Sequence, residues 1–228
     1  MNLKTNKNLF QFYEQFLTEE RKETFDFVLK NRTKYLTVVL EDIYQSQNAS
    51  AVLRTCDALG VQDVHIIEKE HEYTLNPGVT KGCSKWLDLI KYNTFKDNSL
   101  ACVKALKEKG YQIVATTPHE KDCTIDEFEF NKKTALVFGT ELTGVSKTII
   151  DQADAFIKVP MYGFSESFNI SVSAAICIQN LISKLRASKI NWNLTEEEFY
   201  HYKVDWSEKT IRKPELLREE FFANHNEI

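Results

Sequence analysis

The chain has 228 residues, of which 43% are apolar and 27% charged, and its seven glycines and four prolines form no low-complexity run. This composition is typical of a globular domain with one sizeable core, and it excludes collagen-like, repetitive and largely disordered chains. The formal net charge of −4 also argues against a protein that binds nucleic acid through its overall charge, although a local basic surface is compatible with it.

The N-terminal part of the chain predicts one or two amphipathic helices. Residues 8–31 place apolar side chains such as Phe12, Phe16, Phe25 and Leu29 at helical intervals among charged ones. Short, continuous β-branched runs follow, and such runs are typical of strands buried on both faces. We expect strands at residues 35–41, 64–68, 111–117, 134–139 and 155–160.

Helical patterns lie between these strands. Residues 48–59 and 97–109 each end at a glycine, the residue that adopts the left-handed C′ conformation without steric cost. We expect a short helix after Ser146 and a long apolar helix over residues 169–187. This alternation of strands and helices predicts an α/β fold with a mostly parallel sheet flanked by helices.

Residues beyond 190 form an aromatic and charged tail. Thr195 precedes Glu196, Glu197 and Glu198, which is the pattern of a helix N-cap with acidic residues in the first turn. We expect a helical extension that packs either on the main domain or on a partner subunit, and that could also contact a substrate.

The cysteines and the apolar runs indicate the compartment. The five cysteines are widely spaced, with no CxxC pair and no histidine at metal-ligand spacing, so they favour buried thiols over a disulfide framework or a zinc site. No apolar run reaches the roughly 18 residues of a membrane span, and the N-terminus lacks an apolar signal segment. We therefore expect a cytoplasmic protein with no membrane segment and no metal.

Ligands of parallel α/β sheets bind beyond the carboxyl ends of the strands, and the first unusual cluster follows the first predicted strand. In SQNASAVLRTCDALG, Asn48 matches a helix N-cap and Arg54 lies off the predicted buried face. Arg54 could be an ordinary surface arginine. A guanidinium on the first turns of such a helix could also bind an anionic substrate, because arginine forms paired hydrogen bonds to phosphate.

Two further clusters end predicted strands. ATTPHE, residues 115–120, taken by itself predicts only a turn, because threonine and proline are common at strand ends. In LVFGTELTGVS, a buried strand stops at Gly139, which would let a ligand approach the backbone, and Glu141 follows it. Glu141 could equally be an exposed acidic residue in a glycine-containing turn.

The fourth cluster lies in VPMYGFSESFNISVSAAICIQNLI, residues 159–182. Ser165, Ser167 and Asn169 come directly before a long apolar helix. One of them would be enough to cap that helix, so the cluster exceeds what capping requires. No GxGxxG, GxxxxGK[ST] or GxSxG pattern accompanies it, so dinucleotide binding, P-loop hydrolysis and the α/β-hydrolase mechanism are not supported.

Taken in order, these clusters resemble the three sequence motifs of the TrmH-type (SpoU) 2′-O-ribose RNA methyltransferases of the SPOUT superfamily. NASAVLRTCDALGVQDVHII is similar to the first motif, LVFGTELTGVS to the second and VPMYGFSESFNISVSAA to the third. The resemblance covers residues 36–187, and the helices around it look like those of the tRNA-acting branch. It implies a deep trefoil knot in the C-terminal part of the fold, one of the rare exceptions to unknotted connections.

The resemblance also implies a domain order. Residues 1–34 would be an N-terminal helical extension, residues 35–188 the methyltransferase domain and residues 189–228 a C-terminal helical extension. Members of the family are homodimers, so we expect a homodimer that builds its RNA site across the interface.

The cofactor implied by the resemblance is S-adenosylmethionine, held largely by backbone groups. The expected cofactor residues are Thr116, Gly139, Val159, Met161 and Phe168, the last standing where the family usually has leucine.

The expected catalytic residues are Arg54, which would engage the target phosphate and assist the 2′-hydroxyl, and four polar residues that organise the site: Asn48, Glu141, Ser167 and Asn169. None of these candidate site residues is a histidine, and arginine stays protonated, so orientation and electrostatic help suit Arg54 better than general-base action.

The implied activity is methylation of a guanosine ribose 2′-hydroxyl in the tRNA D-loop. A ribosomal RNA 2′-O-methyltransferase of the same family is the main alternative, although such enzymes often carry a separate N-terminal RNA-binding domain. A protein that binds the cofactor and RNA without catalysis is a second alternative.

Overall fold

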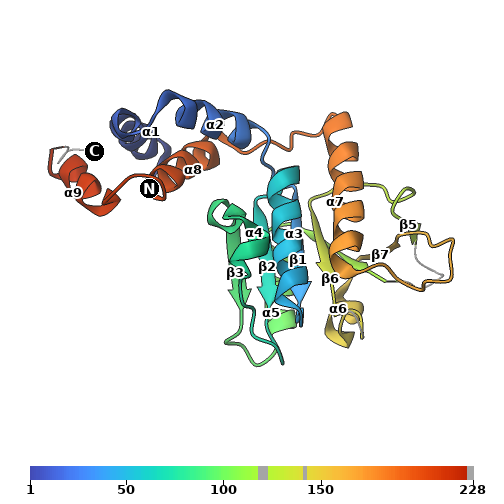
Figure 1. Cartoon of the computed structure of the whole chain (residues 1–228). Helices are drawn as coiled ribbons and strands as arrows, with labels where there is room; N and C mark the ends of the chain where they lie inside the picture. The colour runs from blue at the N-terminus through green and yellow to red at the C-terminus, as the bar shows by residue number, and fades with distance from the viewer. Residues whose placement is uncertain (118–122, 141–142, 225–228) are drawn as a thin grey trace. The chain divides into compact units, whose positions relative to one another are not determined.

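A computed structural model of the chain describes residues 1–117, 123–140 and 143–224. It divides into two compact units. One comprises residues 33–192, and the other comprises residues 1–32 together with the C-terminal residues from 193 onward. Both units are shown in Figure 1, and each is described by itself.

Within the described residues, the unit of residues 33–192 contains one sheet of seven parallel strands in the order β3-β2-β1-β6-β4-β7-β5. The strands are β1 (Leu36–Glu41), β2 (Asp63–Ile67), β3 (Asp88–Tyr92), β4 (Gln112–Thr116), β5 (Cys123–Thr124), β6 (Thr134–Phe138) and β7 (Ala155–Lys158). The prediction of a mostly parallel α/β sheet is therefore confirmed. Because all strands run the same way, their carboxyl ends share one edge.

The five predicted strands are present, and the two that the sequence did not reveal lie at the sides of the sheet. Every residue of β1 and β6 is buried, which explains their continuous apolar runs. Edge strand β3 reads DLIKY and is mostly half-exposed, so its charged residues hide the strand pattern. β5 has only two residues and is too short for a periodic signal.

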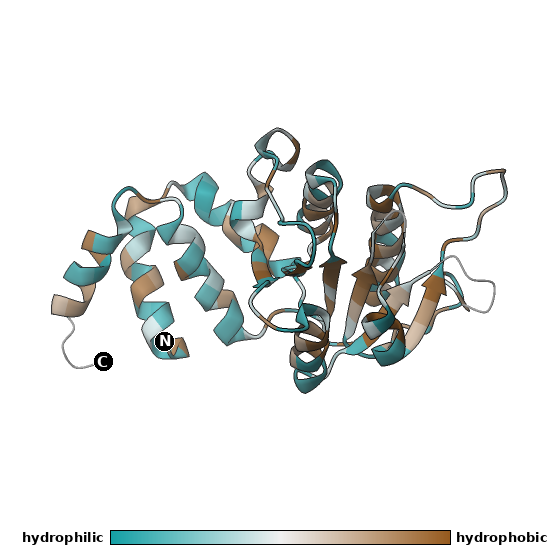
Figure 2. Cartoon of the chain, turned by 90° about the horizontal axis from the view of Figure 1, so that it is seen from below, coloured by the Kyte–Doolittle hydropathy of each residue, from teal (hydrophilic) through white to brown (hydrophobic). Residues whose placement is uncertain are grey.

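Two pairs of helices cover the two faces of this sheet (Figures 1 and 2). Helices α3 (Ser46–Leu59) and α7 (Ile170–Ala187) share one hydrophobic core with the sheet, and α5 (Asn98–Glu108) and α6 (Lys147–Gln152) belong to the other. The strands between them are the most hydrophobic part of the unit in Figure 2. Short α4 (Pro77–Thr80) and η2 (Cys83–Trp86) pack on α3.

Helix ends follow the expected chemistry with one exception. Gly60 and Gly110 have φ of 85° and 80°, as left-handed residues after a helix do. Ser146 accepts a hydrogen bond as the N-cap of α6. Asn48, in contrast, is not the N-cap of its helix, because α3 begins at Ser46 and Asn48 lies in its first turn.

The second unit is helical. It contains α1 (Leu3–Tyr13), η1 (Glu14–Phe16), α2 (Glu19–Lys30), α8 (Glu196–Glu208) and α9 (Pro214–Asn224). Thr195 and Glu198 form a reciprocal capping box at the start of α8, which confirms the predicted N-cap. The charged tail nevertheless supplies core residues, since Trp206 is 2% exposed and stacks against the Arg32 guanidinium at 5.7 Å. None of the helices among the described residues is long and apolar enough to cross a membrane.

Candidate functional site

A cavity of about 1070 Å³ opens at the carboxyl edge of the sheet, beside the ends of β4, β6 and β7. Its wall contains all five residues expected at the cofactor: Thr116, Gly139, Val159, Met161 and Phe168. Ser167 and Asn169 also line it. The three strands and the segment before α7 are far apart in sequence, so the parallel topology is what brings these positions together.

Position 139 requires a glycine because the backbone of the following turn passes close to it. A Cβ atom built on Gly139 would lie 2.1 Å from the carbonyl oxygen of Gly144, where no side chain fits. Thr140 and Gly144 exchange two backbone hydrogen bonds of 3.0 Å across the same turn, and Gly144 has a φ of 68°. The expectation that Gly139 serves the approach of a ligand is thus incomplete, since the close crossing of two backbone segments already requires it.

Two adjacent threonines at the end of β4 differ in their hydrogen bonding. The Thr116 hydroxyl donates to the Val137 carbonyl oxygen at 3.0 Å, so this side chain serves the sheet. The Thr117 hydroxyl is buried, lines the cavity and has no hydrogen-bond partner within residues 1–117, 123–140 and 143–224. The sequence singled out Thr116, whereas the side chain with unused hydrogen-bonding capacity belongs to Thr117.

Asn48 and Asn169 connect the first and third motifs. The Asn169 side-chain amide donates to Asn48 Oδ1 at 3.1 Å, although 121 positions separate the two residues. The other end of the Asn169 side chain caps α7, accepting from the Ser171 N–H at 2.9 Å. Asn48 in turn donates to Gln45 Oε1 at 3.1 Å, which fixes its orientation. The pair joins α3 to the cavity wall.

Ser167 is exposed, and no hydrogen bond joins residues 159–168 to other residues that the structure describes. Of the polar cluster in this segment, only Asn169 acts as a cap. Two aromatic side chains, Tyr162 and Phe164, are fully exposed here. The excess of polar groups noticed in the sequence therefore remains after the helix has been capped.

Arg54 lies outside the wall of the cavity. It is an exposed residue of α3, as predicted, and forms no hydrogen bond or ion pair with another described residue. Its charge lowers the pKa of the Cys83 thiol, which burial raises above its ordinary value, so Arg54 lies near the η2 segment. Glu141 lies outside the described residues.

Three titratable groups of the sheet unit are neutral or paired with another side chain. Burial raises the pKa of Cys177 in the cavity wall to about 12, so this thiol is neutral at physiological pH. His71 Nδ1 lies 3.2 Å from Asp42 Oδ2, and burial lowers the pKa of His65 to about 4. Within the described part of the chain, no group of three or more His, Cys, Asp and Glu side chains could hold a metal ion.

Comparison with known proteins identifies the family. The family model described as the SpoU rRNA methylase family matches residues 35–179. The chain belongs to the SpoU methylase family. The resemblance inferred from the three motifs is confirmed.

Relatives in the SpoU methylase family match along most of this chain. A tRNA (guanosine(18)-2′-O)-methyltransferase of Borreliella burgdorferi is 44% identical over 203 residues, which cover 89% of this chain and 91% of that protein. A protein of the same name from Aquifex aeolicus is 33% identical over 204 residues, covering 88% and 94% respectively.

Solved structures of SpoU methylases share the fold. The A. aeolicus TrmH/SpoU tRNA modifying enzyme superposes with a TM-score of 0.75 at 33% identity, covering 85% of this chain and 98% of that one. The SpoU methyltransferase AviRb of Streptomyces viridochromogenes, solved with the cofactor AdoMet, gives a TM-score of 0.59 at 21% identity, covering 70% and 64%. At 21% identity, the similarity to AviRb concerns the fold alone.

Proposed function

We propose that this protein transfers a methyl group from S-adenosylmethionine to the ribose 2′-hydroxyl of guanosine 18 in the D-loop of tRNA. The observation that carries the proposal is the 44% identity with a tRNA (guanosine(18)-2′-O)-methyltransferase over 89% of this chain. Four of the polar residues expected from the motifs, Asn48, Arg54, Ser167 and Asn169, lie in or beside the cavity wall or on the helix bonded to it.

The cavity fits S-adenosylmethionine. Its volume of about 1070 Å³ accommodates a nucleoside with an amino-acid side chain, and pockets of this kind combine an apolar lining with a few polar groups. Phe168 offers an aromatic surface to the adenine, and the Thr117 hydroxyl, which has no partner in the described part of the chain, offers a hydrogen-bonding group. When bound, the cofactor supplies a methyl group on a positively charged sulfur.

Arg54 binds and orients the RNA in this proposal. Its guanidinium is exposed and forms no ion pair within the described residues, so it is available for a phosphate. Arginine stays protonated in proteins, which means that Arg54 lowers the energy of a developing negative charge on the ribose oxygen rather than accepting its proton.

The remaining polar residues hold the site together. Asn169 fixes the start of α7 and reaches Asn48, so the helix that carries Arg54 is attached to the cavity wall. Ser167 lines the cavity without a partner among the described residues and contacts the cofactor or the ribose. Glu141 would accept hydrogen bonds from donors such as Arg54.

The family membership extends the proposal to architecture. We infer a deep trefoil knot in the C-terminal part of residues 35–188, the methyltransferase domain, with residues 1–34 and 189–228 as helical extensions. We also infer a cytoplasmic homodimer that holds its tRNA across the interface, as expected from the resemblance.

A ribosomal RNA substrate is the second candidate. The observation in its favour is a 33% identity over 160 residues with the 23S rRNA (guanosine-2′-O-)-methyltransferase RlmB of Nitrosomonas europaea. The match covers 69% of this chain but only 60% of that protein. The tRNA relatives from B. burgdorferi and A. aeolicus are matched over more than nine-tenths of their length.

The test is methyl transfer from labelled S-adenosylmethionine to unmodified tRNA and, separately, to ribosomal RNA, followed by nuclease mapping. Labelled 2′-O-methylguanosine at position 18 of tRNA is the expected product. Label in ribosomal RNA alone would move the substrate to the second candidate. Cofactor binding without label in either RNA would contradict the enzymatic proposal.

A further inference from the structure

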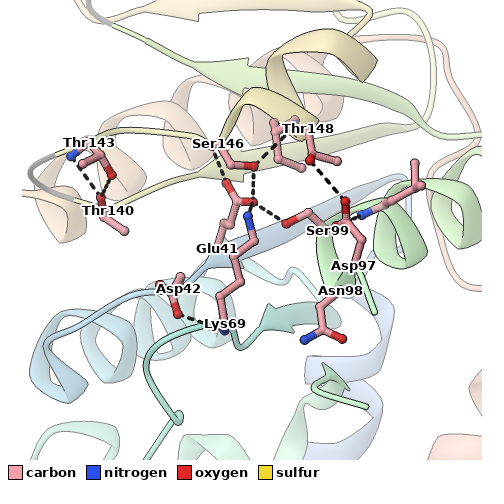
Figure 3. Close-up of polar contacts among 12 residues, drawn as sticks. Glu41, Asp42, Lys69, Asp97, Asn98, Ser99, Thr140, Thr143, Ser146 and Thr148 are labelled. Carbon is pink, nitrogen blue, oxygen red and sulfur yellow. Dashed lines mark hydrogen bonds and ion pairs between the residues drawn. The ribbon is translucent and has the colours of Figure 1, made fainter. Parts of the chain in front are cut away.

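Glu41 is a buried carboxylate at the carboxyl end of β1, beyond the three motifs that define the expected site. It is 2% exposed, and four donors from three other parts of the chain surround it (Figure 3). Ser146 donates twice, from its N–H to Oε2 at 2.8 Å and from its hydroxyl to Oε1 at 2.6 Å. The Ser99 hydroxyl of α5 and the Lys69 ammonium, at 2.8 Å, also reach Oε1.

The two bonds to Ser146 matter because of its place in the chain. Gly144 and Val145 line the cavity, and Ser146 is the next residue and the N-cap of α6. The Ser146 hydroxyl donates to Glu41 and accepts from the Ile149 N–H at 3.4 Å. Glu41 therefore fixes both the backbone and the side chain of the residue where the cavity wall passes into α6.

Glu41 also lies just before the segment that leads to Arg54. β1 continues through residues 42–45 into α3, which carries Asn48 and Arg54. The Glu41 carboxylate belongs to β1 and bonds to Ser146. It therefore sets the distance between the end of β1 and the cavity wall next to Ser146. A buried ion pair is weak support for stability in general, because the cost of removing charges from water offsets the attraction.

We propose that Glu41 is a positioning residue for cofactor binding: its carboxylate holds the Gly144–Ser146 part of the cofactor cavity against the end of β1. This inference rests on the proposed function. Removing the charge should let the wall shift, which weakens cofactor binding while leaving RNA binding intact.

The first variant is Glu41→Gln, which keeps the size of the side chain. Its amide nitrogen donates instead of accepting, so it cannot satisfy the same set of donors. Titration of S-adenosylmethionine into the protein should show a Kd raised roughly tenfold, equivalent to about 1.4 kcal/mol. The KM for the cofactor should rise with it, whereas kcat and the KM for tRNA should stay near those of the wild type.

A matched pair of serine variants separates positioning from stability. Ser146→Ala and Ser99→Ala each remove one hydroxyl bond to the same carboxylate oxygen, but only Ser146 adjoins the cavity wall. Both should lower the thermal midpoint, and only Ser146→Ala should raise the cofactor Kd severalfold. Lys69→Met, which removes the ion pair and keeps the bonds to Ser146, should leave the Kd unchanged.

Three results would overturn the inference. Unchanged cofactor Kd in Glu41→Gln and Ser146→Ala, with lowered thermal midpoints, would reduce Glu41 to a structural residue. Equal increases in Ser146→Ala and Ser99→Ala would do the same, because the effect would not follow the cavity wall. Wild-type protein that bound no S-adenosylmethionine would overturn the proposed function, and the inference with it.

Discussion

The two halves of the sheet's carboxyl edge differ in how their polar groups are used. At the ends of β1 and β2, Glu41, Asp42 and Glu68 are each at most 8% exposed, and each accepts several hydrogen bonds. At the ends of β4, β6 and β7, the Thr117 hydroxyl and the 159–168 segment find no hydrogen-bond partners among the described residues.

This difference distinguishes a scaffold from a site. Where the chain satisfies its own donors and acceptors, the loops after β1 and β2 are held in one arrangement. Where buried or clustered polar groups lack partners, a ligand gains the most by supplying them, because unpaired polar groups carry a desolvation cost. The edge at β1 and β2, called the saturated half below, then provides a rigid frame, and the edge at β4, β6 and β7 binds the ligand against it.

The largest effect is expected for Arg54→Ala. Removal of this exposed side chain should leave the fold unchanged. The kcat should fall by about 10²–10³-fold, the range for losing one group that stabilises developing charge. Methyl transfer under single-turnover conditions measures it. Lys104→Ala, an exposed cation of α5, is the control and should transfer normally. Full activity of Arg54→Ala would remove Arg54 from the mechanism.

Gly139→Ala should damage the cavity wall. The new methyl group would lie 2.1 Å from the Gly144 carbonyl oxygen, so the turn must move, at a cost of about 1–3 kcal/mol in the free energy of unfolding. Cofactor affinity should fall as well, as titration calorimetry would show. Gly163→Ala is the matched control, because a Cβ there meets nothing within 4 Å. Wild-type stability and affinity in Gly139→Ala would contradict the crossing of the two backbones.

Asp42→Asn examines the saturated half. Asp42 Oδ1 accepts from the N–H groups of residues 69, 70 and 71. Burial alone would raise its pKa, but the N–H groups of residues 71 and 69 and the side chain of His71 lower it below its ordinary value. Asparagine tolerates the left-handed φ of 54°, so the variant should lose only the charge, costing about 2 kcal/mol at neutral pH.

The sign of the pH dependence follows from the lowered pKa. The unfolded chain binds the proton more readily, so the stabilisation is complete above about pH 4 and is lost as the pH falls through the folded pKa. Urea unfolding should therefore show that the gap in free energy of unfolding between wild type and Asp42→Asn becomes smaller as the pH falls into the acid range. Exposed Glu72 lies in the same loop, and Glu72→Gln should open no such gap. A gap that is constant with pH would show that the charge is irrelevant.

The smallest effect is expected for Thr117→Val. Its hydroxyl has no hydrogen-bond partner among the residues that the structure describes. Loss of this hydroxyl should raise the cofactor Kd by roughly three- to tenfold, since one hydrogen bond contributes about 1 kcal/mol. Thr116→Val removes a hydroxyl that bonds to Val137 instead, so it should lower the thermal midpoint and spare the Kd. Equal Kd values for the two variants would contradict the assignment of Thr117 to the cavity.

Much of the fold could be read from the sequence because its central strands are buried on both faces. β1 and β6 carry unbroken apolar runs, and Gly60 and Ser146 mark helix ends by their chemistry. Edge strand β3 could not be recognised, since half-exposed positions accept Asp88 and Lys91 without penalty. The start of α3 was misplaced by two residues because Asn48, a typical cap residue, serves a long-range bond instead.

The site was partly predictable for a different reason. Its motifs identify the positions around the cavity, as the lining by Thr116, Gly139 and Phe168 shows. Sequence alone could not tell which of two adjacent threonines uses its hydroxyl within the sheet, because that depends on the pairing of β4 with β6. Nor could it reveal Glu41, whose partner Ser146 lies 105 positions away.

The most direct measurement compares two tRNA transcripts, one with guanosine and one with 2′-deoxyguanosine at position 18, in methyl transfer from labelled S-adenosylmethionine. We predict label in the first and none in the second, with the deoxy transcript competing for binding at a similar concentration. Label in both transcripts would place the methyl group elsewhere than on the ribose oxygen and would contradict 2′-O-methylation.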